Sequence, residues 1–382
     1  MITIKDIQIA VGKTLTANGY TVMASEVKEG FDKPACFVDV FPVNAAVETE
    51  VREFVTDSVE ISYHPAIETR EELIENAEKF KTIFLYSPIE INNRFLSVNE
   101  MLSGARAAGL PLWQYVQETS ANEAGISPEK SWEMMKKRLD AMKEADMAYN
   151  PALRSRSGLT GGDGGKMQQS YESGKSISGA FIGEILSGAL RMGECNACMH
   201  RILAAPTAGA CGVMPAALLS YARKFDTAEE ELVRALYVAA GFGTVIASRA
   251  SISGAEAGCQ AEIGSAAAMS AAALVYLHGG DEQQMAHACA MALKNMLGLV
   301  CDPVAGLVEV PCVKRNAAGA MNALTAAEMA MAGITSRIPA DEVIDAMAAI
   351  GETLPASLRE TGNGGVAATP TGIKFREDYF GK

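Results

Sequence analysis

Three cysteines in the second half of the chain, Cys259, Cys301 and Cys312, constrain its fold more than any other feature. They lie in the segments Glu-Ala-Gly-Cys-Gln-Ala-Glu and Cys-Asp-Pro-Val-Ala-Gly-Leu-Val-Glu-Val-Pro-Cys. Each has Gly or Pro close by in a sequence otherwise rich in Ala, so we expect each on a turn between helices and not on a packed helix face. Three thiolates make an incomplete tetrahedral site, which leaves one position open for water or substrate.

Composition places the chain among intracellular enzymes. Its 382 residues suffice for two or three domains with a buried core, and the net charge of -13 offers no basic patch for nucleic acid. Eight cysteines without a secretory leader pattern predict reduced thiols and a cytoplasmic protein. The uncharged stretch Ile263 to Gly280 consists mainly of Ala, Gly and Ser, so we expect a packed internal helix there and no membrane span.

The chain changes character near residue 97. The first 97 residues hold ten aromatic side chains but a single cysteine, Cys36. We therefore expect a small α+β domain over residues 1–97, of uncertain role, ahead of a mainly α domain over residues 98–382. Within the first domain the pattern predicts helices at Ile4–Asn18 and Thr69–Lys81 and strands at Cys36–Phe41 and Asp57–Tyr63. In the second domain, Ser97–Lys143 has helical spacing, and Ser127 with Pro128 opens its second helix.

A glycine-rich loop is predicted over Tyr149–Gly165. Its glycines let backbone N–H groups approach an anion, and Ser157, Thr160 and two arginines supply directed donors, so the loop can wrap a carboxylate. Such a loop, taken alone, is more often a flexible connector. Lys166 follows it and would serve as a base if burial lowered its pKa, although an exposed lysine is the commoner arrangement.

A second metal pattern competes with the first. Cys195 and Cys198 form a C-x-x-C, with His200 and Cys211 close behind, and these four residues together are a possible zinc site. The alternative is that they are buried thiols in a helical segment, because free cysteine packs as a small hydrophobe. Cys289 lies among Ala and Met, which predicts a core position.

From about residue 99 the chain resembles the α chain of the iron-sulfur-dependent L-serine dehydratases. The resemblance covers about three quarters of the chain, and its motifs stand in the family's order. They are Arg154–Asp163, Ala204–Pro215, the two cysteine segments, Lys314–Asn316 and Ala367–Gly372.

The resemblance implies an Ala-rich helical catalytic domain that holds a 4Fe-4S cluster on Cys259, Cys301 and Cys312. The separations of 42 and 11 residues between them match the family's ligand pattern. The iron without a protein ligand would act as Lewis acid in converting L-serine to pyruvate and ammonia, with no pyridoxal phosphate. The catalytic candidates are Ser157, Thr160, Asp163, Lys166, Arg315 and Asn316. Arg315 either orients the substrate's carboxylate or compensates the charge of the cluster.

The family usually adds a β part with a Ser-Ser-Ser-His-Thr-like substrate loop, and this sequence has no such loop. The resemblance therefore implies a separate β subunit, and we expect an oligomer. Residues 1–95 are similar in overall pattern to small phage tail-completion proteins. Two alternatives remain open: an eliminase acting on threonine or cysteine, and a non-catalytic fusion or phage-assembly chain that lacks its β partner.

Overall fold

The computed structural model describes residues 22–23, 35–42, 57–64 and 97–381. The chain divides into two compact units, residues 1–93 and residues 94–382.

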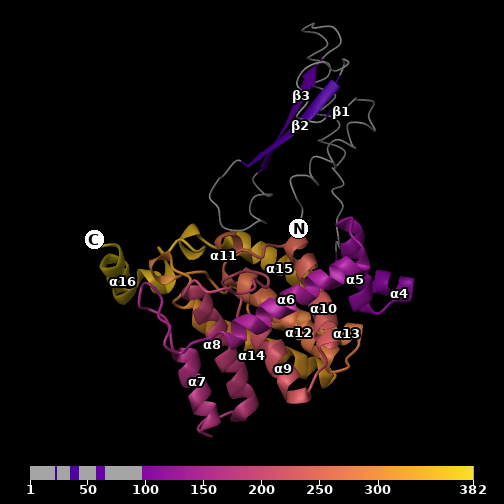
Figure 1. Cartoon of the computed structure of the whole chain (residues 1–382). Helices are drawn as coiled ribbons and strands as arrows, with labels where there is room; N and C mark the ends of the chain where they lie inside the picture. Colours follow the sequence, from indigo (N-terminus) through magenta and orange to yellow (C-terminus); the bar gives the residue numbers. More distant parts are fainter. Residues whose placement is uncertain (1–21, 24–34, 43–56, 65–96, 382) are drawn as a thin grey trace. The chain divides into compact units, whose positions relative to one another are not determined.

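Three strands of the first unit form one sheet in the order β1–β2–β3 (Figure 1). Strand β1 (Val22–Met23) pairs parallel with β2 (Ala35–Pro42), which pairs antiparallel with β3 (Asp57–His64) along all eight residues of each. Strands β2 and β3 coincide with the two alternating runs of the sequence. The helices predicted at Ile4–Asn18 and Thr69–Lys81 lie outside the described residues, so the α+β class of the first domain stays a prediction.

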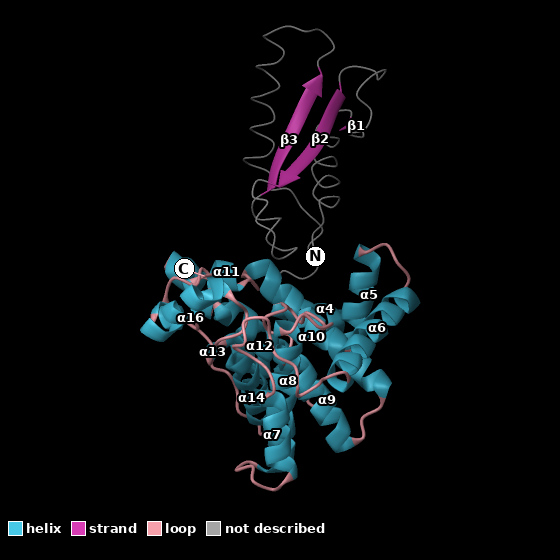
Figure 2. Ribbon diagram, turned by 60° about the vertical axis from the view of Figure 1, so that its left-hand side comes forward, coloured by secondary structure: helices cyan, strands magenta, loops and turns pink. Residues whose placement is uncertain are grey.

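The second unit is helical, as predicted, and its described residues contain no strand beyond an isolated bridge between Cys301 and Arg359 (Figure 2). Its helices are α4 (Val98–Ala108), α5 (Leu112–Glu123), α6 (Pro128–Met147), α7 (Asp163–Glu172), α8 (Gly179–Ala197), α9 (Val213–Phe225), α10 (Glu229–Arg249), α11 (Gly254–Ala257), α12 (Ser265–Leu277), α13 (Glu282–Lys294), α14 (Cys312–Met331), α15 (Ala340–Thr353) and α16 (Pro370–Phe380).

The segment predicted as two helices up to Lys143 forms three. Gly109 takes a left-handed φ of 65° that ends α4, and Pro111 then starts α5, so the helical pattern is interrupted by a Gly-to-Pro turn. The start of α6 is as predicted, because the Ser127 side chain accepts a hydrogen bond from the Lys130 N–H and Pro128 occupies the first turn.

Helix α12 lies in the core. Every residue from Ser265 to Val275 is buried, and α12 packs against α9, α10, α13 and α14. Its alanine-rich surface lets the neighbouring helices approach closely on all sides. The internal helix expected within the uncharged stretch is confirmed. Helix α10 is the one helix among the described residues that is long and apolar enough to cross a membrane by length and composition, and 61% of that stretch is buried in the bundle.

Glu229, the first residue of α10, ties that helix to α6. Its carboxylate accepts from Lys136 at 2.8 Å and from Lys143 at 2.5 Å. Hydrogen bonds from these two lysines hold the pKa of Glu229 at about 2. The carboxylate also suits the positive end of the helix.

Candidate functional site

The three predicted ligand cysteines lie at helix ends. Cys259 sits between α11 and a π-helical turn, η1 (Gln260–Gly264), Cys301 lies between α13 and α14, and Cys312 is the first residue of α14. All three are free thiols, with exposed fractions of 1%, 2% and 6%. Cys301 thus lies between helices as expected, whereas Cys259 and Cys312 stand at helix starts, and all three positions are buried.

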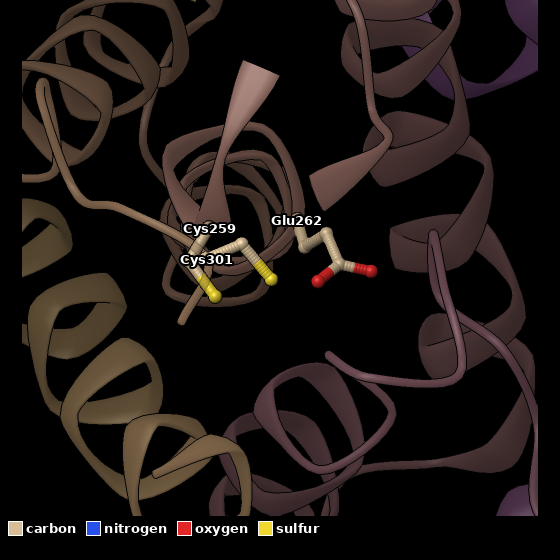
Figure 3. A group of neighbouring side chains, drawn as sticks. All are labelled: Cys259, Glu262 and Cys301. Carbon is tan, nitrogen blue, oxygen red and sulfur yellow. The ribbon is translucent and has the colours of Figure 1, made fainter. Parts of the chain in front are cut away.

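Cys259 and Cys301 form a tight group with Glu262 (Figure 3). The two sulfurs and a Glu262 carboxylate oxygen all lie within 4.8 Å of one another. Cys312 stands outside this group but is close enough for the charges of Cys259 and Glu262 to raise its pKa, after the larger effect of burial. Arg315, on the same helix as Cys312, contacts Cys259, so the start of α14 lies beside the paired cysteines.

Electrostatics single out Cys259 among the three. A hydrogen bond from the Cys301 thiol lowers the pKa of Cys259, and the positive charge of Arg315 adds to that effect against the cost of burial. The same hydrogen bond, together with burial, raises the pKa of Cys301. Cys259 is thus the first of the three to become a thiolate, the form that binds metal.

Glu262 was missed in the sequence analysis. Burial, helped by the charges of Cys259 and Glu360, raises its pKa to about 8, although a hydrogen bond with Thr207 opposes the shift. A largely protonated carboxyl therefore faces the sulfurs near neutral pH. The signal was present, because Glu262 is the last charged residue before the uncharged stretch that begins at Ile263.

Arg315 contacts Cys259 and the two residues on either side of Cys301. Its Nη1 donates to the Val300 carbonyl at 2.8 Å and to Cys259 Sγ at 3.5 Å. Its Nη2 lies 2.9 Å from Oδ1 of buried Asp302, an ion pair without hydrogen-bond alignment. Asp302 Oδ2 accepts from the Val366 N–H at 2.7 Å. Of the two roles considered for Arg315, these contacts favour compensation of negative charge at the cysteines.

Asn316 holds a neighbouring loop. It is 1% exposed, its Nδ2 donates to the carbonyls of Gly209 and Cys312 at 2.8 and 3.0 Å, and its Oδ1 accepts from the Gly212 N–H at 2.8 Å. A Cβ on Gly212 would lie 2.5 Å from the Ala189 carbonyl, so this close approach requires glycine. With both amide hydrogens used, Asn316 positions the loop between α8 and α9.

The glycine-rich loop carries the remaining candidates. The Ser157 hydroxyl faces the Glu309 carboxylate at 2.8 and 2.9 Å. Thr160 is buried, and its N–H donates to the Ser155 hydroxyl at 3.2 Å. The loop is therefore internally bonded, and Glu309 connects it to the segment before Cys312.

Asp163 and Lys166 form a surface ion pair at the start of α7. Asp163 lies 2.8 Å from Lys166 and 3.1 Å from Lys314, and the Lys166 side chain is 75% exposed. A role for Lys166 as a catalytic base would require a buried side chain, and this side chain is exposed. The Asp163–Lys314 contact joins α7 to the first turn of α14.

Glu194 is a second carboxylate missed in the sequence analysis. It is fully buried in α8, where it accepts from the Tyr149 hydroxyl and from the Asp163 N–H, both at 2.6 Å. Burial and the bond to Glu194 raise the pKa of Tyr149. Glu194 thereby fixes both ends of the glycine-rich loop.

The competing zinc pattern is not assembled. Within residues 97–381 the group of Cys259, Glu262 and Cys301 is the only one with three ligand atoms mutually within 4.8 Å. Burial raises the pKa of Cys195 to about 11, and the Cys211 thiol donates to the Met192 carbonyl at 3.6 Å. The buried-thiol alternative therefore fits better, and Cys289 lies in the core as expected.

Comparison with known proteins identifies the family to which the helical unit is similar. A family model described as serine dehydratase alpha chain matches residues 107–367, and one described as phage tail terminator protein matches residues 6–106. A probable L-serine dehydratase alpha chain of Bacillus subtilis (strain 168) is 54% identical over 253 residues, 66% of this chain and 84% of that protein. A probable L-serine dehydratase alpha chain of Latilactobacillus sakei is 55% identical over 199 residues, 52% of this chain and 95% of that protein. The L-serine dehydratase alpha chain of Peptoniphilus asaccharolyticus is 39% identical over 294 residues, 74% of this chain and 98% of that protein. The family match contains all three cysteines and the helices that carry them, and the chain belongs to the serine dehydratase alpha chain family.

Proposed function

We propose that this chain is the α chain of an L-serine dehydratase, which eliminates water from L-serine. The observation that carries the proposal is the pair of buried free cysteines Cys259 and Cys301, with buried Cys312 on the helix whose Arg315 contacts Cys259, all inside the region matched by the family. The Cα proton and the hydroxyl leave L-serine as water. The aminoacrylate that remains tautomerises to an imine, which water hydrolyses to pyruvate and ammonia.

We further propose that Cys259, Cys301 and Cys312 hold a 4Fe-4S cluster. The donor set fits, because the thiols are soft ligands, are not joined in disulfides and are all buried. When bound, a cluster with only three protein ligands supplies a Lewis acid that polarises the substrate's hydroxyl.

The chain's own residues supply charge balance and orientation. Arg315, held by Asp302, offsets negative charge beside Cys259, and Asn316 fixes the loop that faces Glu262 at Gly209. Glu262 is the carboxyl that the structure brings within 4.8 Å of the cysteine sulfurs, so its Oε atoms can hold a proton next to the reacting group. Burial of the three cysteines, Asp302 and Asn316 limits the access of bulk water to the cysteines.

The relatives that cover the site are named alpha chains, and we propose that this chain too works with a β chain in the cytoplasm. A threonine or cysteine eliminase is the second candidate, because the described contacts define the cysteine site more closely than a pocket for the substrate's side chain.

The test is iron-dependent pyruvate formation. The full chain is reconstituted without oxygen with iron and sulfide, and L-serine, D-serine, L-threonine and L-cysteine are compared with and without a β chain from a relative. We expect pyruvate from L-serine, far less product from the other three, and loss of activity after chelation of iron. Activity that requires pyridoxal phosphate, or that survives removal of iron, would refute the proposal.

A further inference from the structure

Glu309 is a buried carboxylate bonded to the glycine-rich loop. It precedes Cys312 by three residues and is 7% exposed. Its Oε2 accepts from the Ser155 hydroxyl at 2.6 Å, and both of its oxygens face the Ser157 hydroxyl, at 2.9 and 2.8 Å. These bonds join segments that lie more than 150 positions apart in the sequence.

The partners of the Glu309 carboxyl are hydroxyl groups. Within residues 97–381 no ion pair is formed with this carboxylate, so hydroxyl groups alone replace its hydration. A buried polar side chain needs hydrogen-bond partners, and those of Glu309 lie on the glycine-rich loop. Glu309 thereby holds that loop against the segment before Cys312.

The two serines are fixed on their other sides as well. The Ser155 hydroxyl accepts from the Thr160 N–H at 3.2 Å, and the Ser157 hydroxyl accepts from the Leu159 N–H at 3.1 Å. Their hydroxyl oxygens also lie 3.1 Å from each other, where either serine can be the donor. These contacts anchor the backbone around the residue between them.

That residue is Arg156, whose side chain is exposed. Its guanidinium has no hydrogen bond or ion pair within the described part of the chain, whereas neighbouring Arg154 donates to the carbonyls of Pro151 and Leu153. A guanidinium presents a planar set of donors that matches a carboxylate with two parallel hydrogen bonds. Anchored serines on both sides reduce the freedom that Arg156 would lose on binding an anion.

We propose that Arg156 binds the substrate's carboxylate and that Glu309 is the positioning residue that holds Arg156 for this task. The inference rests on the proposed function, because the carboxylate is that of L-serine. In this proposal the glycine-rich loop binds a carboxylate, as expected, and Arg156 makes the contact. Ser155, Ser157 and Glu309 hold the loop in position.

The first experiment measures binding and does not depend on turnover. The full iron-loaded chain is titrated anaerobically with L-serine and with L-serinamide, which lacks the carboxylate. Arg156→Gln should weaken L-serine binding about tenfold or more while leaving L-serinamide unchanged, and Arg156→Lys should recover part of the loss. Equal losses for both ligands, or no binding of L-serine by the unaltered chain, would overturn the proposal. Binding without pyruvate formation would instead count against the proposed function alone.

The second experiment asks whether Glu309 acts through Arg156. Glu309→Gln should weaken L-serine binding several-fold in the unaltered chain but less than twofold when Arg156→Gln is already present. Hydrogen exchange of the metal-free chain should be faster over residues 153–160 in Glu309→Gln. Glu231→Gln is a control away from the loop, because Glu231, on α10, also accepts from a hydroxyl, that of Tyr276 at 3.0 Å, and pairs with Arg234. If Glu309→Gln weakens L-serine binding by the same factor with and without Arg156→Gln, Glu309 does not act through Arg156. That result would overturn its assignment as the positioning residue.

Discussion

Replacing Asn316 with alanine should damage both stability and the site. The change leaves the Gly212 N–H and the Gly209 carbonyl without the partners they have now, in a region where Asn316 is 1% exposed. Each buried polar group left unsatisfied costs about 1–3 kcal/mol, so the free energy of unfolding should fall by about 2–6 kcal/mol. That is a large share of the stability of an ordinary domain.

Asn322→Ala is the matched control. Asn322 lies on the same helix, is also buried, and donates to the Ala292 carbonyl at 2.8 Å while its Oδ1 accepts from Asn295. Asn322→Ala should lower the free energy of unfolding by about 1–3 kcal/mol, because it leaves one backbone group, the Ala292 carbonyl, without its side-chain partner. Because these contacts tie α14 to α13, we expect the cysteine site to remain intact in this variant.

Two measurements separate the variants. Urea unfolding of the metal-free chain, followed by circular dichroism of the helical transition, gives the stability change, and iron per chain after anaerobic reconstitution reports the site. We expect reduced iron only for Asn316→Ala. If this variant loses no more stability than Asn322→Ala and takes up the full amount of iron, our account of Asn316 as the support of the site is wrong.

Three further predictions concern the ligands, the domain junction and pH. Replacing any one of the three ligand cysteines with alanine should abolish the visible absorption of the iron-loaded chain, whereas Cys195→Ala with Cys198→Ala should retain it; the reverse pattern would contradict the ligand assignment. A chain that begins at Ser97 should keep its helical spectrum and iron, because it retains the N-cap of α4. A chain that lacks α4 should unfold at lower urea, since Val98 and three other α4 residues are buried; equal urea midpoints for the two chains would disprove this. Glu229→Gln should lower the urea midpoint at neutral pH, and the difference from the unaltered chain should shrink as pH falls from 4.5 toward 2. The reason is that the pKa of Glu229, lowered to about 2, stabilises the fold above pH 4.5, and this contribution is lost on protonation. A difference in midpoint that is independent of pH would contradict the prediction.

The sequence predicted those features that depend on local chemistry. Gly and Pro beside the cysteines indicated turns, Ser127 with Pro128 marked a helix start, and the alanine-rich stretch from Ile263 indicated a buried helix. Each of these signals lies within a few residues of the element it determines, so no knowledge of distant segments was needed.

The side-chain roles were harder to predict because they depend on distant partners. Ser157 was expected to bind substrate, but the structure places Glu309 against its hydroxyl, 152 positions along the chain. The carboxyl groups of buried Glu194 and half-buried Glu262 show the same limit. In the sequence an acidic residue suggests a solvated surface, and only tertiary packing reveals that Glu194 has no exposure at all.

The distant motifs meet at the start of α14, and this gives a physical reason for their occurring together in one chain. Lys314 contacts Asp163, Arg315 contacts Cys259 and Asp302, and Asn316 bonds the loop between α8 and α9. Glu309, one turn earlier, holds the glycine-rich loop. Because consecutive residues of one rigid helical turn hold four separate segments, a shift of this turn would displace all four together. Changes in these contacts should therefore combine non-additively, in contrast to changes at well-separated positions such as Glu229.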